Sequence, residues 1–378
     1  MKREKFLIDN FRTCNRCIMD STAEDIKFDE NGNCNFCSNF LLRKKNSYLK
    51  KNKLDEFIDN LKNTNTDKPY NCIVGVSGGV DSSFTLLKTI ELGLRPLAVH
   101  LDNGWNSELA QSNISNLVSS LGVDLYTHVV DWEEYKKLQQ AFFDSNVIDI
   151  ELLLDNAMLA INYQMAKKYN IKYILSGTNS ATEGFKIPNN WSWFKNDKRN
   201  IYKIGKKFSN IKPKTLPTFG THDFIYYELI KKIKWVLFLD YFNYNKFEAI
   251  EILKLKCNYK PYPYKHYESV FTRFYQGYIL PKKFNVDKRK LHLSNLICSN
   301  QMERDEAMNI MQKNAYDSKD QLNKDIKYFL KKMDWTLEDL NNYLETPEIP
   351  HDHYGSEKSL WNFYTKFYKQ LNLKKLFN

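Results

Sequence analysis

Serine, glycine and aspartate residues gather in a short stretch near position 80. Residues 71–87 read NCIVGVSGGVDSSFTLL. Adjacent glycines let a backbone approach a ligand closely, and a helix start offers free N–H groups and the positive end of its dipole. The stretch therefore predicts a site for an anion with many acceptor oxygens. The side chains and glycines that would form it are Ser77, Gly78, Gly79, Asp81, Ser82 and Ser83.

The flanking residues predict how this loop is held. The apolar run 72–76 is typical of a buried strand, and residues 84–90 are typical of a helix that leaves the loop. The loop is not a Walker A motif, because that pattern requires a lysine that is missing here. The alternative is a plain strand–turn–helix, in which the glycines serve only the turn.

Four cysteines near the N-terminus form a second candidate site. Cys14 and Cys17 make one C-x2-C pair, Cys34 and Cys37 make another, and sixteen residues separate the pairs. This spacing is typical of structural zinc sites, in which four thiolates fill the coordination sphere. An iron–sulfur cluster or a redox pair is the alternative. Four thiolates leave no open coordination position on the metal for a reaction. We therefore expect this module to have a structural or docking role rather than a catalytic one.

Composition and charge limit the classes of protein to which this chain can belong. The chain has 378 residues, of which 42% are hydrophobic and 27% charged, and its formal net charge is +11. The charge favours an anionic partner, but the basic residues are spread along the chain rather than clustered. No apolar run approaches the ~18 residues of a membrane helix, and the first twenty residues lack a signal-peptide core. We therefore expect a cytoplasmic protein without a transmembrane segment.

Alternating elements after the loop predict the fold class. Buried strands are expected at 94–102, 123–130 and 171–175, with helices to residue 121 and over 150–169 between them. Strands that alternate with helices indicate an α/β fold with a doubly wound parallel sheet. Such sheets bind ligands beyond the carboxyl ends of their strands. A further helix is expected over 224–239.

Two more loops should therefore join the one near position 80. Asp102 and Asn103 end the second expected strand, and Gly177 and Thr178 follow the fourth. The domain plan is a four-cysteine module at 1–40, a helix and linker at 41–68, a nucleotide-type domain at 69–300, and a helical region at 301–378.

The segment 265–276, KHYESVFTRFYQ, places several chemical groups close together. On the helix expected here, His266, Glu268 and Arg273 supply a titratable ring, a carboxylate and a fixed cation. A solvated helix with ion pairs is the alternative for this segment taken alone.

Several motifs together resemble a known family. The S-G-G-x-D-S loop is similar to that of the PP-loop ATP pyrophosphatases. The four-cysteine module, SGGVDSS, LDNGWN, SGTNSATEG and KHYESVFTRFYQGYILPKKFNVDKRKLHLSNLICS together resemble the N-acetyl sugar amidotransferases of bacterial lipopolysaccharide O-antigen and pseudaminic acid pathways. The resemblance runs from about residue 14 to about 343. Residues 260–264, KPYPY, depart from the glycine-rich approach expected there.

The resemblance implies a reaction. The acetamido group of a sugar or sugar nucleotide becomes an acetamidino group through an O-adenylyl imidate, and ATP yields AMP and pyrophosphate. ATP with Mg²⁺ and structural Zn²⁺ are the implied cofactors. The loop residues would hold the phosphates, with Asp81 ordering the loop or meeting Mg²⁺, while Asp102, Asn103, Gly177 and Thr178 would lie near the adenosine. Lys265, His266 and Arg273 would stabilise the α-phosphate or grip an anionic sugar, and Glu268 would guide a proton from ammonia.

The resemblance also implies a separate glutaminase, paired as in imidazole glycerol phosphate synthase with a subunit that channels ammonia. Position 2 is lysine, and Cys72, Cys257 and Cys298 lie in no nucleophile-elbow motif. We therefore expect ammonia from a partner, and no nucleic-acid partner. Two alternatives stay open, namely a tRNA-thiolating PP-loop enzyme and a non-catalytic nucleotide-binding scaffold.

Overall fold

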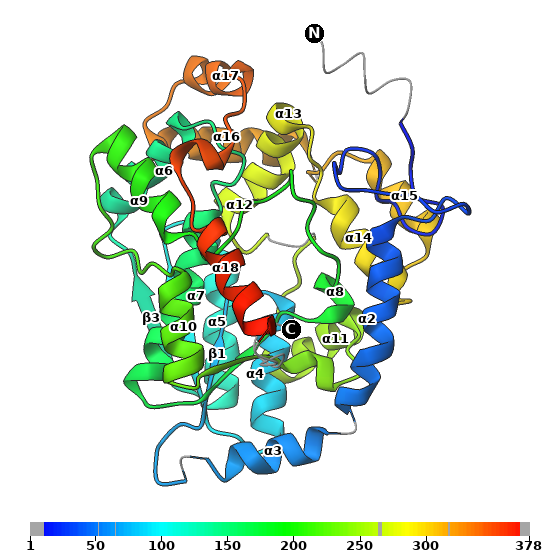
Figure 1. Ribbon diagram of the computed structural model, residues 1–378, viewed down its shortest axis with the longest axis vertical. Coiled ribbons are helices and arrows are strands. Elements are labelled where there is room, and N and C mark those ends of the chain that lie inside the picture. The colour runs from blue at the N-terminus through cyan, green and yellow to red at the C-terminus, as the bar shows by residue number, and fades with distance from the viewer. Residues whose placement is uncertain (1–10, 52, 65, 264–266, 317, 371–378) are drawn as a thin grey trace.

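The computed structural model describes residues 11–51, 53–64, 66–263, 267–316 and 318–370 (Figure 1). Its centre is a five-stranded sheet in which all neighbouring strands run parallel, in the order β3-β2-β1-β4-β5. The strands are β1 (Cys72–Gly75), β2 (Pro96–Asp102), β3 (Leu125–Val129), β4 (Tyr173–Ser176) and β5 (Lys234–Leu237). The predicted α/β fold with a doubly wound parallel sheet is therefore confirmed.

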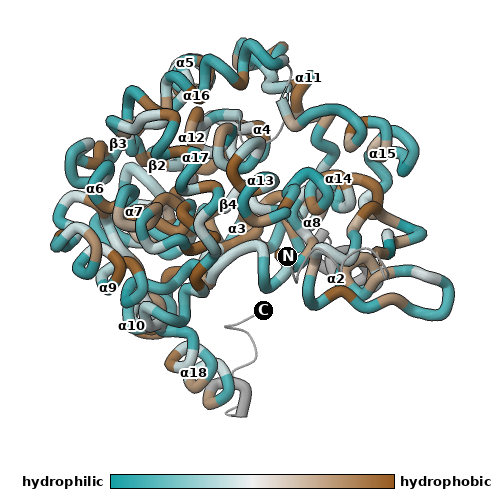
Figure 2. The backbone as a smooth tube through the Cα atoms, turned by 90° about the horizontal axis from the view of Figure 1, so that it is seen from above, coloured by the Kyte–Doolittle hydropathy of each residue, from teal (hydrophilic) through white to brown (hydrophobic). Residues whose placement is uncertain are grey.

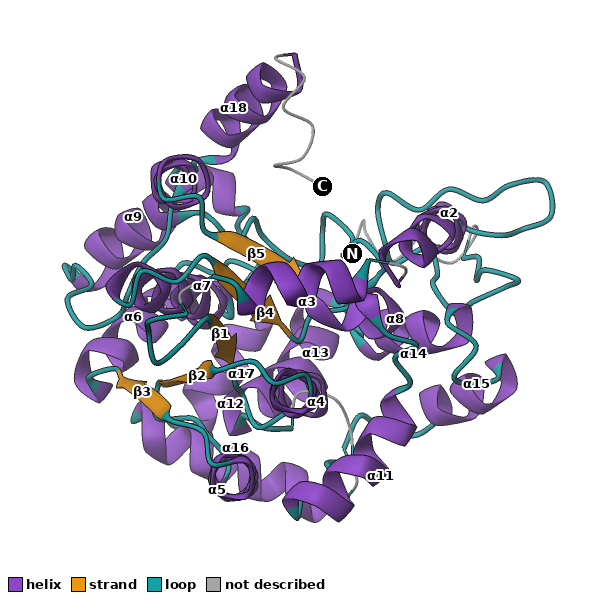
Figure 3. Ribbon diagram, turned by 90° about the horizontal axis from the view of Figure 1, so that it is seen from below, coloured by secondary structure: helices purple, strands orange, loops and turns teal. Residues whose placement is uncertain are grey.

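Helices cover both faces of this sheet (Figure 3). On one face, Ile73 of β1 packs in a large core with the helix α7 (Leu152–Lys168). On the other face, Val74 packs in a second core with the helix α4 (Val80–Glu91). Successive side chains of a strand point to opposite faces, so β1 contributes to both cores and reads as a continuous apolar run.

The remaining helices surround this centre. They are α2 (Asn35–Lys51), α3 (Leu54–Lys62), α5 (Glu108–Leu121), α6 (Trp132–Asp144), α8 (Ser180–Glu183), α9 (Lys198–Ser209), α10 (Thr221–Ile225), η1 (Tyr226–Ile230), η2 (Phe238–Tyr241), α11 (Lys246–Cys257), α12 (Val270–Phe274), η3 (Tyr275–Ile279), α13 (Leu280–Phe284), α14 (Arg289–Cys298), α15 (Arg304–Gln312), α16 (Lys319–Met333), α17 (Leu337–Glu345), η4 (His351–Tyr354) and α18 (Lys358–Gln370). Figure 2 colours the backbone by the hydropathy of each residue, and many of the hydrophobic segments lie inside the molecule. The helix α18 extends away from the body (Figure 2). None of the helices in the described ranges is both long and apolar enough to cross a membrane.

One expected element is wrong. Residues 224–239 were expected to form one helix, but helical structure ends at Ile230 and residues 234–237 form the fifth strand, β5. This strand pairs with β4 in the register Tyr173 to Lys234. A short apolar run fits a buried helix or a buried strand equally well, and the open edge of β4 decides between them.

The region after residue 300 is helical, as expected, and packs back onto the sheet domain. Met333 and Leu340 join the same core as Ile73. The helix α17 is capped by Thr336, whose hydroxyl accepts a bond from the N–H of Asp339 in a capping box.

His351 ties the C-terminal segment to the body. Its ring is buried, its Nε2 accepts a hydrogen bond from the N–H of Asp149 (3.1 Å), and its Nδ1–H donates to Asn200 Oδ1 (2.8 Å). Trp193 stacks on the ring with centroids 4.8 Å apart. These contacts require a neutral imidazole, and burial lowers the pKa of His351 to about 3.

Stability should therefore fall on mild acidification. The unfolded chain takes up a proton on His351 near pH 6.5 while the folded chain does not, so folding stability present above that pH is lost as the pH falls. At ~1.4 kcal/mol per pH unit for one proton, the loss is about 2 kcal/mol by pH 5. Urea unfolding measured from pH 7 to 5 checks this, with His351→Gln as the comparison. An equal pH slope in that variant would contradict the assignment.

Candidate functional site

The loop after β1 has the geometry of an anion cradle. Gly78 has a φ of +82°, and a Cβ at this position would lie 2.9 Å from the carbonyl oxygen of Ala110. Gly79 is the N-cap of α4, so no side chain closes off the first N–H groups of this helix. The hydroxyls of Ser77 and Ser82 lie 3.3 Å apart across the loop. Backbone donors and two hydroxyls therefore face one small space.

Asp81 is held rather than free. Its carboxylate accepts hydrogen bonds from the hydroxyl of Tyr244 and from Thr182 Oγ1, the second at 3.2 Å. Burial, followed by the charge of Asp81, raises the pKa of Tyr244 well above its usual value, so this phenol remains a donor. These contacts join the start of α4 to the segments that follow β4 and β5.

The loop after β4 approaches the same helix start. A Cβ on Gly177 would lie 2.7 Å from the backbone nitrogen of Ser82, so only glycine fits there. The next residue, Thr178, donates its N–H to Ser176 Oγ (3.1 Å). Asp240, from η2, accepts bonds from the N–H and the hydroxyl of Ser180 (2.7 and 2.8 Å). The loops after β4 and β5 thus support one another beside α4.

The loop after β2 is the third side of the site. Asp102 Oδ1 accepts the N–H of Gly104 (2.8 Å), and Asn103 Oδ1 accepts the N–H of Trp105 (3.2 Å). Asp102 and Asn103, the two residues predicted to lie in this loop, therefore each use one side-chain oxygen to hold the turn. Ser107 caps the next helix, α5, because its hydroxyl accepts the N–H of Ala110.

His100, which the sequence reading missed, joins two of these loops. Its ring is buried on β2, Nδ1–H donates to the carbonyl of Val76 (2.8 Å), and Nε2 accepts from Asn106 Nδ2 (3.0 Å). Burial lowers the pKa of His100, which keeps the ring neutral for both bonds. A histidine inside an otherwise apolar strand was the only signal in the sequence.

The segment around Glu268 meets the sheet at this edge. Ser107 donates its N–H to the carbonyl of Glu268, and Val270 donates to the carbonyl of Trp105, each at 2.9 Å. Glu268 Oε1 lies 3.4 Å from the point where a Cβ of Gly79 would be. The C-terminal part of the chain therefore brings a carboxylate to the rim of the anion cradle.

The helix expected over 265–276 begins later than expected. It starts at Val270 as α12, because the hydroxyl of Ser269 accepts the N–H of Thr272 (3.2 Å) and caps it. Glu268 thus precedes the helix, so the spacing of a helix does not determine where its side chain lies. Lys265 and His266 lie outside the described residues.

Arg273 points away from this rim toward the C-terminal region. Its guanidinium binds Asp325 of α16 through two bonds, Nε to Oδ2 (2.6 Å) and Nη2 to Oδ1 (2.7 Å). The two side chains are only 13% and 4% exposed. Paired carboxylate and guanidinium groups of this kind are strong and directional, so Arg273 anchors α12 to α16.

The four cysteines converge as predicted. Cys14, Cys17, Cys34 and Cys37 place their sulfur atoms within 4.8 Å of one another, and all four residues are buried. The Sγ atoms of Cys14 and Cys37 are 3.8 Å apart, and those of Cys17 and Cys34 are 3.6 Å apart. Tetrahedral coordination with metal–sulfur bonds of about 2.3 Å needs sulfurs about 3.8 Å apart. One metal ion therefore fits the cluster.

The cysteine module docks on the C-terminal region. Arg304 of α15 donates to the carbonyls of Cys14 and Cys17, each at 3.2 Å. Ile18 packs with Leu293 and Leu296 of α14. The module therefore serves as a staple between the N-terminus and these helices.

His222 and Asp223 lie in the first turn of α10. Asp223 caps the start of α10 through the N–H of Gly220 (2.9 Å) and pairs with Lys198 (3.2 Å). His222 contacts the ring of Tyr364. The contacts of this pair are therefore those of a helix start.

Similar solved structures share low identity with this chain. NMN synthetase from Francisella tularensis is 16% identical with a TM-score of 0.27, and the match covers 58% of this chain and 99% of that chain. The NH3-dependent NAD synthetase from Campylobacter jejuni, in complex with nitrate, is 14% identical with a TM-score of 0.28, over 56% and 93% of the two chains. The U34-tRNA thiolase NcsA from Methanococcus maripaludis, with its [4Fe-4S] cluster, is 11% identical with a TM-score of 0.28, over 79% and 87%.

These likenesses assign no function at such identities and scores, and no curated protein matches the chain. A family model does match the part that carries Glu268, Arg273 and the helices α12 to α17. Over this part of the chain, the match confirms the relationship to lipopolysaccharide-pathway proteins that the motifs predicted. Residues 268–368 match the C-terminal domain of the WbpG-like LPS biosynthesis proteins.

Proposed function

We propose that this protein is an ATP-dependent amidotransferase that converts the acetamido group of a sugar or sugar nucleotide to an acetamidino group. One observation carries the proposal: the loop 77–83 lies at the start of α4, and Glu268 of the family-specific domain reaches its rim. The strand order places this loop where β2 and β4 flank β1 on opposite sides. Doubly wound sheets bind nucleotides at such a switch point.

The loop residues would bind the phosphates of ATP. The N–H groups at the start of α4, with the hydroxyls of Ser77 and Ser82, supply donors for the β- and γ-phosphates. Asp81 keeps the loop in shape through Tyr244 and Thr182. Asp102, Asn103, Gly177 and Thr178 would flank the adenosine from the two neighbouring loops, and Mg²⁺ would accompany the nucleotide.

The chemistry then requires an activated amide. The acetamido oxygen attacks the α-phosphorus of ATP, the bond to pyrophosphate breaks, and an O-adenylyl imidate forms. Ammonia adds to the imidate carbon, loses a proton, and AMP leaves with the former carbonyl oxygen. Glu268 would accept the proton at the rim of the loop, and Lys265 and His266 would stabilise charge on the α-phosphate. Positioning and charge neutralisation supply most of the rate.

Ammonia would come from a separate glutaminase. The described cysteines outside the metal cluster are Cys72, Cys257 and Cys298, and all three are buried. Burial raises the pKa of the Cys72 thiol and of the Cys257 thiol, which disfavours a nucleophilic thiolate. A chain that alone hydrolysed glutamine at a useful rate would contradict this part of the proposal.

The structural metal would be zinc. Four buried thiolates suit Zn²⁺, whose structural sites are tetrahedral and closed. The bound ion would hold the module against α14 and α15 and would take no part in the reaction.

Mass spectrometry of candidate acetamido sugars tests the reaction. The sugars are incubated with the protein, ATP, Mg²⁺ and ammonium, and ammonium replaces the glutaminase. The expected product is lighter than the substrate by the difference between O and NH, and AMP and pyrophosphate accumulate with it. A tRNA-thiolating enzyme would instead bind tRNA with steep salt dependence, and a scaffold would form no AMP with any acceptor.

Arg273 is expected to act by positioning. Arg273→Gln leaves Asp325 buried without its cation, which should cost about 3–5 kcal/mol of folding stability and most of the activity. The double variant Arg273→Met with Asp325→Leu removes both charges and should regain most of both. Unfolding and turnover are measured on each variant. If the double variant is stable but its turnover remains lost, Arg273 contacts the substrate, as the sequence first suggested.

A further inference from the structure

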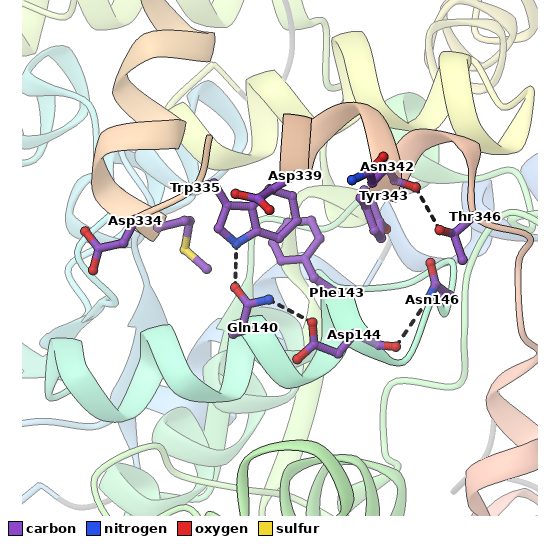
Figure 4. A pocket seen from close by; sticks show the side chains of 11 residues that line it. Gln140, Phe143, Asp144, Asn146, Asp334, Trp335, Asp339, Asn342, Tyr343 and Thr346 are labelled. Atoms are coloured by element: carbon purple, nitrogen blue, oxygen red, sulfur yellow. Dashed lines mark hydrogen bonds between the residues drawn. The ribbon is translucent and has the colours of Figure 1, made fainter. Parts of the chain in front are cut away.

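The structure has a second concave site, and no residue of the loop 77–83 lines it. It is a pocket of about 530 Å³ between α6 and the pair α16 and α17 (Figure 4). Its volume falls within the range of small-molecule sites. Nothing in the proposed reaction uses it, and it lies between the sheet domain and the WbpG-like domain.

The floor of this pocket is aromatic. Phe143 and Tyr343 are 1% and 6% exposed, and each lies edge-to-face with Trp335, at centroid distances of 4.9 and 5.9 Å. Trp335 is less buried and donates its indole N–H to Gln140 Oε1 (2.6 Å). The pocket therefore contains a fixed aromatic ring that a ligand can reach.

The rim is acidic and rich in acceptors. Asp144, Asp334 and Asp339 are exposed around the opening. Asp334 pairs with Lys136 (2.5 Å) and Asp339 caps α17, whereas Asp144 has no cationic partner among the described residues. In a chain of net charge +11, the rim is therefore locally acidic through Asp144 and Asp339, while the charge of Asp334 is offset by Lys136.

Helix ends strengthen this negative field. The C-terminal turn of α6 supplies Gln140 and Asp144, α16 ends at Met333 beside the pocket, and the last turn of α17 supplies Asn342. The C-terminus of a helix carries the negative end of its dipole and unpaired carbonyls. The ends of α6 and α16 therefore favour a cation here, whereas the C-terminal carbonyls of α17 already bind Lys283.

One contact and one buried hydroxyl describe the far end of the pocket. At one end of the pocket, Lys283 Nζ already binds the carbonyls of Tyr343 and Thr346 and Asn146 Oδ1. The hydroxyl of Tyr343 is buried with no hydrogen-bond partner among the described residues, and Figure 4 shows its ring reaching from α17 into the pocket. Acceptor groups at this end of the pocket therefore already bind one cationic nitrogen of the protein itself.

We propose that this pocket binds a small organic cation, an amidinium, guanidinium or ammonium group carried on a planar or apolar body. The charged nitrogen lies beside Asp144, and the body stacks on Trp335. Attraction between a cation and an aromatic face, together with the carboxylates, supplies the selectivity.

A matched pair of probes tests this directly. Benzamidine is a planar amidinium, and benzamide has nearly the same shape without the charge. In the full-length protein carrying ¹³C-labelled methionine methyl groups, benzamidine should shift the Met333 methyl resonance, and benzamide should not. The resonance is assigned with Met333→Leu. No shift up to the solubility limit of benzamidine, or an equal response to benzamide, would overturn the proposal.

Variants then connect the shift to the acidic rim. Asp144→Asn should weaken benzamidine binding about fivefold, a value near 1 kcal/mol for an exposed ion pair. The control is Asp320→Asn, which removes the same charge from the other end of α16 and should leave binding unchanged. Thermal unfolding confirms that each variant is folded. Equal affinity of Asp144→Asn and the parent protein for benzamidine would refute the assignment. If Asp144→Asn does not fold, Trp335→Leu is measured instead, because it removes the aromatic face and should also weaken binding.

Discussion

Replacing Gly177 by alanine should lower the rate of AMP and pyrophosphate formation by about 100-fold or more. The added Cβ would lie 2.7 Å from the nitrogen and 2.8 Å from the Cα of Ser82, and 2.9 Å from the carbonyl carbon of Asp81. All three are backbone atoms, so the loop after β4 or the start of α4 must move. A displacement near 1 Å of a reacting group can cost about 100-fold in rate.

Gly122→Ala is the matched control for this variant. Gly122 caps α5 with a φ of +62°, and a Cβ there would meet nothing within 4 Å. Backbone strain should cost about 1 kcal/mol of stability and leave turnover unchanged. Rates of pyrophosphate release, with the unfolding free energy of both variants, separate the two effects. If Gly177→Ala retained the parental rate, the close approach of these loops would have no part in catalysis.

Replacing Cys34 by serine should release the bound metal and destabilise the protein by at least ~3 kcal/mol. Metal binding is folding free energy for such modules, and structural zinc supplies about 10–16 kcal/mol in zinc-finger peptides. The loss should also loosen the contacts of the module with α14 and α15, which include the bonds from Arg304. Metal content per chain and urea unfolding provide the two readouts.

The control for that variant is Cys257→Ser. Cys257 is equally buried, but it lies in the core that contains α4, away from the cluster. A buried thiol exchanged for a hydroxyl should cost about 1–2 kcal/mol and leave the metal content at one ion per chain. If Cys34→Ser kept a full complement of metal, the four sulfurs would not be its ligands.

Some elements could be predicted from the pattern of neighbouring residues alone. The run that contains Ile73 and Val74 is continuous and apolar, so β1 and the turn into α4 could be read directly. The two cysteine pairs have the spacing by which metal-binding modules bring four thiolates together. In both cases the chemistry depends on residues that are close in sequence.

Features that arise from long-range contacts could not be read in the same way. Strand β5 exists because β4 has an open edge, and the bonds that hold Asp81 come from Thr182 and Tyr244, more than a hundred residues away. Asp325 gave no sign that it would engage Arg273. The position of Glu268 beside Gly79 was not expected either, since the resemblance implied only that Glu268 would guide a proton from ammonia.

An oxygen-18 label tests the central claim most directly. The acetamido sugar is labelled at its carbonyl oxygen and incubated with the protein, ATP, Mg²⁺ and ammonium. If the amide oxygen attacks the α-phosphorus, the label must leave in the phosphate of AMP, and pyrophosphate must remain unlabelled. Unlabelled AMP, or the formation of ADP and labelled orthophosphate, would contradict the account.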